Sequence, residues 1–361
     1  AQAHTGPSRA ASAAPVCPFL GGIALLGMAG PAGLLRVLVT SGAGRVGKEV
    51  TARLRQSNPD IFIRCGCRRA EKNDFLVKSL GANEVVELDY TKPETYDAAL
   101  SGVNAVYSSS PDPALKGHEA FAKAIGSNPT YKESIKHIVR LSCFGAEQNT
   151  GSYDLQTHVT SPGAKVPHML QGYWLAERYL LETGIPTTAV RGNFFMSHLF
   201  KPDVDNIRDN GFFSLPLGEA RNSYVSTNDL GEIAAMALLG GPEKYGDKFY
   251  DITGPRPESM HEVAATLAKA SGKPVEYRPS DKAQFIADFG QTRWEFIEYL
   301  LNGFYCRVSP DFYNLTGRQP TNYFDHLTKA GAAGETGLEE LFNAPSMWTK
   351  GKDLFKEEAK A

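Results

Sequence analysis

Acidic residues are missing from the start of this 361-residue sequence: none precedes Glu49, and residues 11–35 carry no charge of either sign. The uncharged stretch has the length of a membrane-spanning segment, which needs about 20 apolar residues, but glycines and prolines interrupt it throughout. The Ala/Ser-rich beginning, with a single arginine in residues 1–14, is typical of an organelle-targeting peptide. We therefore expect residues 1–34 to be a targeting remnant or N-terminal extension of a protein from a plastid or mitochondrion. A cytoplasmic location and a membrane contact of residues 11–35 stay open as alternatives.

Cysteines are also scarce. There are five, an odd number, and no two of them form a C-x-x-C pair. This pattern argues against both a disulfide framework and a structural zinc site. We expect reduced thiols and no bound metal. The five are Cys17, Cys65, Cys67, Cys143 and Cys306.

Several catalytic signatures are absent as well. The sequence contains no H-E-x-x-H, no G-x-S-x-G and no phosphate-binding G-K-[ST] motif. Metalloprotease, hydrolase and nucleotidase functions therefore lack support. The formal net charge of −2 gives no reason to expect nucleic acid as a partner.

The sequence does contain a glycine-rich turn between a strand pattern and a helix pattern, VLVTSGAGRVGKEV at residues 37–50. Gly42, Gly44 and Gly47 stand at G-x-G-x-x-G spacing, which allows the backbone to approach a pyrophosphate at the start of the helix. Ser41 adds a hydroxyl to the same turn. We expect cofactor contacts from Ser41, Gly42, Gly44, Arg45, Val46 and Gly47.

Strand patterns then alternate with helix patterns, which predicts an α/β fold of the Rossmann type with a doubly wound parallel sheet. We expect a dinucleotide-binding domain over residues 35–195, a small C-terminal α/β lobe over 196–330 that is interleaved with the core, and a tail over 331–361. The expected strands are 35–41, 61–68, 84–90, 103–110, 135–145 and 187–195.

Two local features of the C-terminal half carry further expectations. Asn228 stands where a helix begins and is expected to be its N-cap. Residues 281–304 have a helical pattern with a stripe of aromatic side chains, which we interpret as core packing and not as a ligand wall. The stripe comprises Phe285, Phe289, Trp294, Phe296 and Tyr299.

The end of the second strand indicates which dinucleotide binds. An NAD site generally has a carboxylate there for the ribose hydroxyls, but this strand runs into Arg68 and Arg69. A guanidinium presents a fork of donors suited to a phosphate. We therefore expect NADP(H), with NAD(H) less favoured. At the ends of the fourth and fifth strands, the candidates to flank the ribose and nicotinamide are Ser108, Ser109, Ser142 and Cys143.

The stretches VLVTSGAGRVGKEV, GVNAVYSSSP, IKHIVRLSCFGAE and YVSTNDLGEIAAMAL occur here in a characteristic order. Over residues 35–328 the sequence resembles the NmrA-like family of the atypical short-chain dehydrogenase/reductase superfamily. The resemblance implies a Rossmann domain, a small C-terminal lobe and a cleft between them. It also implies one of three activities: NAD(P)H-dependent reduction of quinones or azo dyes, isoflavone-type reduction, or cofactor sensing with little turnover.

The sequence departs from that family in two places. Ser41 stands where the family's first turn glycine falls, and Gly42 is expected to compensate. Tyr173 stands where related reductases carry a lysine, four residues before Glu177. Many short-chain reductases pair a tyrosine acid with a lysine four residues later, and none of the 15 tyrosines here has one.

Two functions remain. The first is an NAD(P)H-dependent reductase of electron-poor acceptors such as quinones, with Tyr173 as a candidate catalytic residue. The alternative is a non-catalytic NADP(H) sensor or accessory subunit of a larger organellar complex. Its partner surfaces would be the N-terminal extension, the 145–167 loop or the C-terminal tail.

Overall fold

In the computed structural model, the described residues are 34–109, 115–146, 153–154, 159–160, 168–197 and 203–343. The two expected partner surfaces at residues 1–34 and 145–167 lie almost entirely outside them. None of the helices in the described ranges combines the length and hydropathy needed to cross a bilayer.

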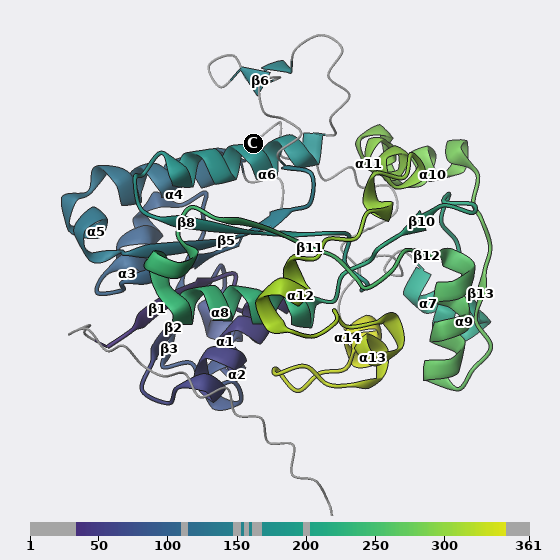
Figure 1. The fold of residues 1–361 in the computed structure, drawn as a ribbon, viewed down its shortest axis with the longest axis horizontal. Coiled ribbons are helices and arrows are strands. Elements are labelled where there is room, and N and C mark those ends of the chain that lie inside the picture. Colours follow the sequence, from purple (N-terminus) through teal and green to yellow (C-terminus); the bar gives the residue numbers. More distant parts are fainter. Residues whose placement is uncertain are drawn as a thin grey trace, which may run out of the picture. The chain divides into compact units, whose positions relative to one another are not determined.

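Seven parallel strands form the central sheet, in the order β11-β8-β5-β4-β1-β2-β3. The order reverses at β1, which pairs with β2 on one side and with β4 on the other (Figure 1). Ligands of such sheets bind at the carboxyl ends of the strands beside this reversal. The fold class predicted from the sequence is confirmed. The strands are β1 (Arg36–Thr40), β2 (Phe62–Cys67), β3 (Glu84–Glu87), β4 (Ala105–Ser108), β5 (His137–Cys143), β8 (Thr187–Gly192) and β11 (Phe249–Ile252).

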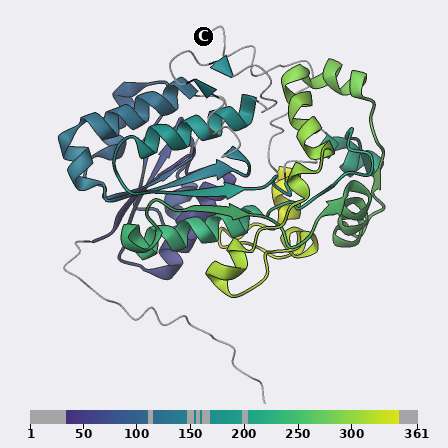
Figure 2. The same cartoon turned by 45° about the horizontal axis from the view of Figure 1, so that its top comes forward.

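Helices cover both faces of the sheet (Figure 2). Alternate residues of each strand face opposite layers, so Val37 and Val39 pack under α1 and α8 while Leu38 packs on the other face. The first layer contains α1 (Arg45–Ser57), α2 (Phe75–Lys78), α8 (Thr227–Tyr245) and α12 (Asp311–Thr316). The other contains α3 (Tyr96–Leu100), α4 (Leu115–Ser127), α5 (Pro129–Ser134) and α6 (His168–Leu181).

The C-terminal lobe is built around a second, aromatic core. The aromatic stripe lies in it as expected, but on two helices, because Gly290 with φ of 89° breaks the predicted helix between α10 and α11. The lobe helices are α7 (Val204–Asn210), α9 (Met260–Ser271), α10 (Lys282–Phe289), α11 (Gln291–Leu301), α13 (Tyr323–Thr328) and α14 (Gly337–Asn343). Its short strands are β9 (Phe212–Phe213), β10 (Arg221–Asn222), β12 (Glu258–Ser259) and β13 (Glu276–Tyr277). Short 3₁₀ turns are η1 (Ala70–Lys72), η2 (Pro93–Thr95) and η5 (Phe304–Cys306), and β6 (Tyr153–Asp154) pairs with β7 (Val159–Thr160).

The N-cap predicted for α8 is wrong. Ser226 caps the helix, because its Oγ accepts a hydrogen bond from the backbone N–H of Asn228 at 3.2 Å. The helix therefore starts one residue earlier than Asn228. Serine and asparagine are both good caps, so composition alone does not distinguish them.

Residues 331–343, part of the expected tail, pack along α1. The Glu49 carboxylate accepts hydrogen bonds from the backbone N–H groups of Ala332 and Ala333, both at 2.9 Å. Arg45 and Lys48 form ion pairs with acidic residues of the same segment. The segment therefore contacts the helix that begins at the glycine turn.

Candidate functional site

The turn after β1 contains a serine in the left-handed conformation. Ser41 has a φ of 49°, a value that favours glycine, at the position of the family's first glycine. Its Oγ donates to the carbonyl of Ser109 at 2.9 Å, and Thr40 Oγ1 donates to the same carbonyl at 2.7 Å. These two hydrogen bonds tie the turn to the end of β4. The expectation that Gly42 compensates is wrong, because Ser41 itself adopts the conformation.

Two glycines keep the turn tight against α1. A Cβ at Gly47 would lie 2.4 Å from the carbonyl oxygen of Ser41, and one at Gly44 would lie 3.0 Å from the same atom. Gly44 is the N-cap of α1, and no side chain of the described residues caps this helix or places an acid in its first turn. The N-terminus of α1 therefore keeps the partial positive charge that attracts an anion. Gly42 lies behind the turn, where a Cβ would meet Cys65 Cβ at 2.8 Å.

Arg45 and Val46, the first two residues of α1, have different roles. The Val46 side chain is buried in the core, so only its backbone faces the turn. Arg45 forms an ion pair with Glu340, and its Nη1 donates to Ser197 Oγ at 3.0 Å. Burial lowers the pKa of Arg45 and the charge of Glu340 opposes this effect. The guanidinium of Arg45 is thus held by the C-terminal segment.

Arg68 and Arg69 extend exposed from the end of β2. Throughout the described ranges, neither guanidinium forms an ion pair with a carboxylate. The charge of Arg68 acts on Asp89: burial raises the pKa of this carboxyl, but hydrogen bonds from Thr91 and the nearby Arg68 lower it overall. Gly42 N donates to the carbonyl of Gly66 at 3.1 Å, which joins the glycine turn to the strand that carries both arginines.

The ends of β4 and β5 bring the remaining predicted residues to the same sheet edge, with different orientations. Ser108 is buried, and its Oγ lies 3.3 Å from the Tyr90 hydroxyl. Ser142 donates to the Glu177 carboxylate on α6. Cys143 instead has its Sγ 3.7 Å from the hydroxyl of Tyr305, which comes from the C-terminal lobe.

Tyr173 is half-buried on α6, above the end of β5. The Glu177 carboxylate one turn along is paired bidentately with Arg191, with Nε–Oε1 at 2.9 Å and Nη2–Oε2 at 2.7 Å. The guanidinium carbon of Arg140 lies 6.0 Å from the centre of the Tyr173 ring. The Glu177 carboxylate, four residues after Tyr173, is therefore neutralised by an arginine of the neighbouring strand β8.

Sequence reasoning missed two residues of this region. Arg140 interrupts the apolar strand HIVRLSC, and that interruption was a usable signal. Tyr305 is fully buried, which raises its pKa well above 10. Tyr305 follows β5 by more than 160 residues, and no local pattern predicts its contact with Cys143.

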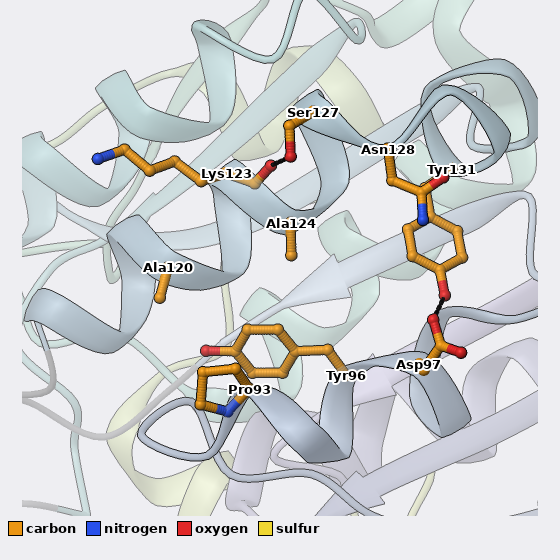
Figure 3. Close-up of a pocket in the computed structure, with 9 residues that line it drawn as sticks. All are labelled: Pro93, Tyr96, Asp97, Ala120, Lys123, Ala124, Ser127, Asn128 and Tyr131. Carbon is orange, nitrogen blue, oxygen red and sulfur yellow. Dashed lines mark hydrogen bonds between the residues drawn. The ribbon is translucent and has the colours of Figure 1, made fainter.

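A surface depression of about 430 Å³ lies elsewhere, between α3, α4 and α5 (Figure 3). Two of its polar side chains already have partners: Tyr131 donates to Asp97, and Ser127 Oγ donates to the Lys123 carbonyl at 2.6 Å. Asn128 and Tyr131 immediately precede β5, so the depression lies toward the opposite edge of the sheet from the glycine turn. We assign no part of the candidate site to it.

A parallel sheet whose order reverses beside a glycine turn defines a Rossmann-type dinucleotide-binding fold. The chain belongs to the NmrA-like family, whose sequence profile matches residues 35–297. This match confirms the resemblance predicted from the sequence.

Known proteins resemble this chain over most of its length. The NAD(P)H azoreductase of Xenophilus azovorans is 28% identical over 310 residues, which cover 82% of this chain and 98% of that protein. Triphenylmethane reductase of Citrobacter sp. with NADP(H) has a TM-score of 0.64 and 21% identity, covering 80% of this chain and 98% of that one. The NADPH-dependent quinone oxidoreductase of Escherichia coli with NADPH has a TM-score of 0.63 and 19% identity, covering 81% and 98%.

Proposed function

We propose that this protein is an NADPH-dependent reductase of electron-poor acceptors such as quinones. The observation that carries the proposal is the uncapped start of α1 after a glycine turn. The turn is joined through β2 to Arg68 and Arg69, which are exposed and form no ion pair in the described chain. The family includes reductases, and the azoreductase and quinone oxidoreductase similar to this chain are named for such acceptors.

The residues of the turn fit a dinucleotide. The pyrophosphate would lie against the N-terminus of α1, where Gly44 and Gly47 leave the backbone open. The extra phosphate of NADP(H) would lie against Arg68 and Arg69, since a planar guanidinium suits a phosphate. When bound, the reduced nicotinamide supplies a hydride to the acceptor.

An electron-poor acceptor matches what the chain offers for catalysis. None of its tyrosines has a lysine four residues later, so the usual tyrosine–lysine acid of short-chain reductases is missing. A quinone accepts a hydride readily and needs less acid assistance than an ordinary ketone. The end of β5, with Cys143, Tyr173 and Tyr305, is where the acceptor would meet the nicotinamide.

The test mixes the purified full chain with NADPH and a panel of benzo- and naphthoquinones and follows the loss of nicotinamide absorbance. We expect oxidation above the protein-free rate, faster with NADPH than with NADH. Cofactor binding, measured separately by quenching of tryptophan fluorescence, identifies the alternative. Measurable binding without oxidation would replace the reductase with a non-catalytic NADP(H) sensor or accessory subunit.

A further inference from the structure

A buried positive charge lies under the candidate site. The Arg140 side chain on β5 is 1% exposed, and among the described residues no carboxylate pairs with it. Its Nη1 makes one long hydrogen bond, 3.4 Å to the Ser108 carbonyl, and its Nε has no hydrogen-bond partner. The guanidinium therefore has no neutralising acid among the described residues.

Such an arginine is unfavourable for folding. An unpaired buried charge destabilises the folded state, and an apolar side chain of similar volume is often as stable or more so. The neighbours on α4 and β4 do not offset this cost: His118 is buried, and burial together with Arg140 lowers its pKa well below 6.5. Packing alone therefore does not explain an arginine in the middle of this strand.

The geometry does give Arg140 a target. Tyr173, on the helix that covers this end of β5, has its ring 6.0 Å from the guanidinium carbon, within the range of a cation–π contact. Charged and titratable groups near Tyr173 include Glu177 on the same helix, Arg191 paired with it from β8, and Tyr305 from the lobe with Cys143 beside it. Arg191 is paired with Glu177, whereas Arg140 has no carboxylate partner among the described residues.

We propose that Tyr173 donates the proton to the reduced acceptor and that Arg140 is its positioning residue. Arg140 has the role that a lysine on the same helix has in other short-chain reductases. This inference rests on the proposed function. The cation here comes from the sheet beneath the helix, so a search for lysine at the fourth residue does not find it.

The reaction balances with the proposed cofactor and one proton from solvent. Hydride leaves NADPH, which is oxidised to NADP+, and reduces the quinone to a hydroquinone monoanion. The O–H bond of Tyr173 breaks as its proton joins the anionic oxygen. The ring of the phenolate that remains lies near Arg140, whose charge stabilises it until water returns a proton. A nearby cation lowers the pKa of a phenol, which is the direction this step needs.

The first test uses the free protein and requires no turnover. Tyrosine ionisation is followed by ultraviolet difference absorbance from pH 7 to 12 in wild type, Tyr173→Phe, Arg140→Met and Arg140→Lys. We expect wild type to show one tyrosine that titrates at least one pH unit below the others, and Tyr173→Phe to lack it. Arg140→Met should raise the midpoint of this transition by at least one pH unit. Arg140→Lys should bring the midpoint most of the way back to its wild-type value. Arg178→Met, an exposed arginine on α6, should change nothing.

The second test measures rates and stability together. Tyr173→Phe and Arg140→Met should lower kcat about 10- to 100-fold while the Kd for NADPH stays within twofold. Arg140→Met should keep or raise the unfolding midpoint, and its activity should decline at a higher pH on the alkaline side. If wild type and Tyr173→Phe gave coincident titration curves while wild type oxidised NADPH with quinones, the donor role of Tyr173 would be overturned and the proposed function would stand. No oxidation by wild type would overturn the proposed function and with it the donor role.

Discussion

At the scale of single residues, the choice between the two nicotinamide dinucleotides depends on Arg68. Its guanidinium is exposed at the end of β2 and, in the part of the chain that the structure describes, has no ion pair to break before it binds a phosphate. A charge-assisted hydrogen bond contributes about 1.5–3 kcal/mol. We expect Arg68→Ala to weaken NADPH binding roughly 10- to 100-fold and to leave NADH binding nearly unchanged. Fluorescence titration with both cofactors measures this, with Lys78→Ala on α2 as control. Equal losses for the two cofactors would contradict the assignment.

Gly47 tests the glycine turn itself, independently of the extra phosphate. A methyl group at this position would lie 2.4 Å from the Ser41 carbonyl oxygen, so the turn must open to accommodate it. Gly47→Ala should therefore weaken NADPH and NADH together, by at least 10-fold in the same titration. Gly172→Ala is the matched control, because a Cβ there meets nothing within 4 Å. A Gly47→Ala protein with both affinities intact would place the dinucleotide elsewhere.

At the scale of elements, the sequence predicts what depends on local pattern. Runs of β-branched residues located the sheet strands, and the glycine spacing located the turn before α1. What it could not predict depends on contacts between distant segments. Ser41 adopts a glycine conformation while its hydroxyl donates a hydrogen bond to the carbonyl of Ser109, which follows β4. The Glu177–Arg191 pair and the approach of Tyr305 to Cys143 likewise join segments far apart in the chain.

The contact between α1 and the segment at residues 331–343 gives a prediction at the scale of elements. Glu49 is 4% exposed, and its two oxygens accept the backbone N–H groups of Ala332 and Ala333. In Glu49→Gln one acceptor becomes an amide nitrogen, which leaves a partly buried N–H without a partner. We expect the free energy of unfolding in urea to fall by about 1–3 kcal/mol. Glu182→Gln, in an exposed i,i+4 pair just past the end of α6, should change this free energy by less than about 0.5 kcal/mol. Equal stability of the two variants would show that the segment does not stabilise α1.

At the scale of the whole molecule, Asp229, His326 and His137 are buried and titratable. Asp229, at the start of α8, accepts hydrogen bonds from Thr321 N and Oγ1, both at 2.7 Å, and so fastens the lobe to the helix layer. His326 on α13 contacts Ser226, the N-cap of α8, with Nδ1 3.0 Å from Ser226 Oγ. His137 starts β5, with Nε2 2.8 Å from Thr188 Oγ1. Protonation of any of these groups is therefore linked to folding of the entire chain.

These groups set the acid side of the stability profile. Burial lowers the pKa of His137 and of His326 to about 4, against 6.5 in a model peptide. Because the unfolded chain binds these protons first, the stability they provide is complete above pH 6.5 and is lost as pH falls toward 4. Asp229 has the opposite effect on stability, because burial raises its pKa to about 6. Below that pH the folded protein binds this proton more readily than the unfolded chain does, which offsets part of the loss. The free energy of unfolding should thus fall most steeply between about pH 6 and 5. His326→Gln should reduce the total loss of unfolding free energy between pH 6.5 and 4 by about 2–3 kcal/mol. Urea unfolding at intervals of half a pH unit measures this loss. If the unfolding free energy of His326→Gln depended on pH as that of wild type does, His326 would take up its proton in the folded protein.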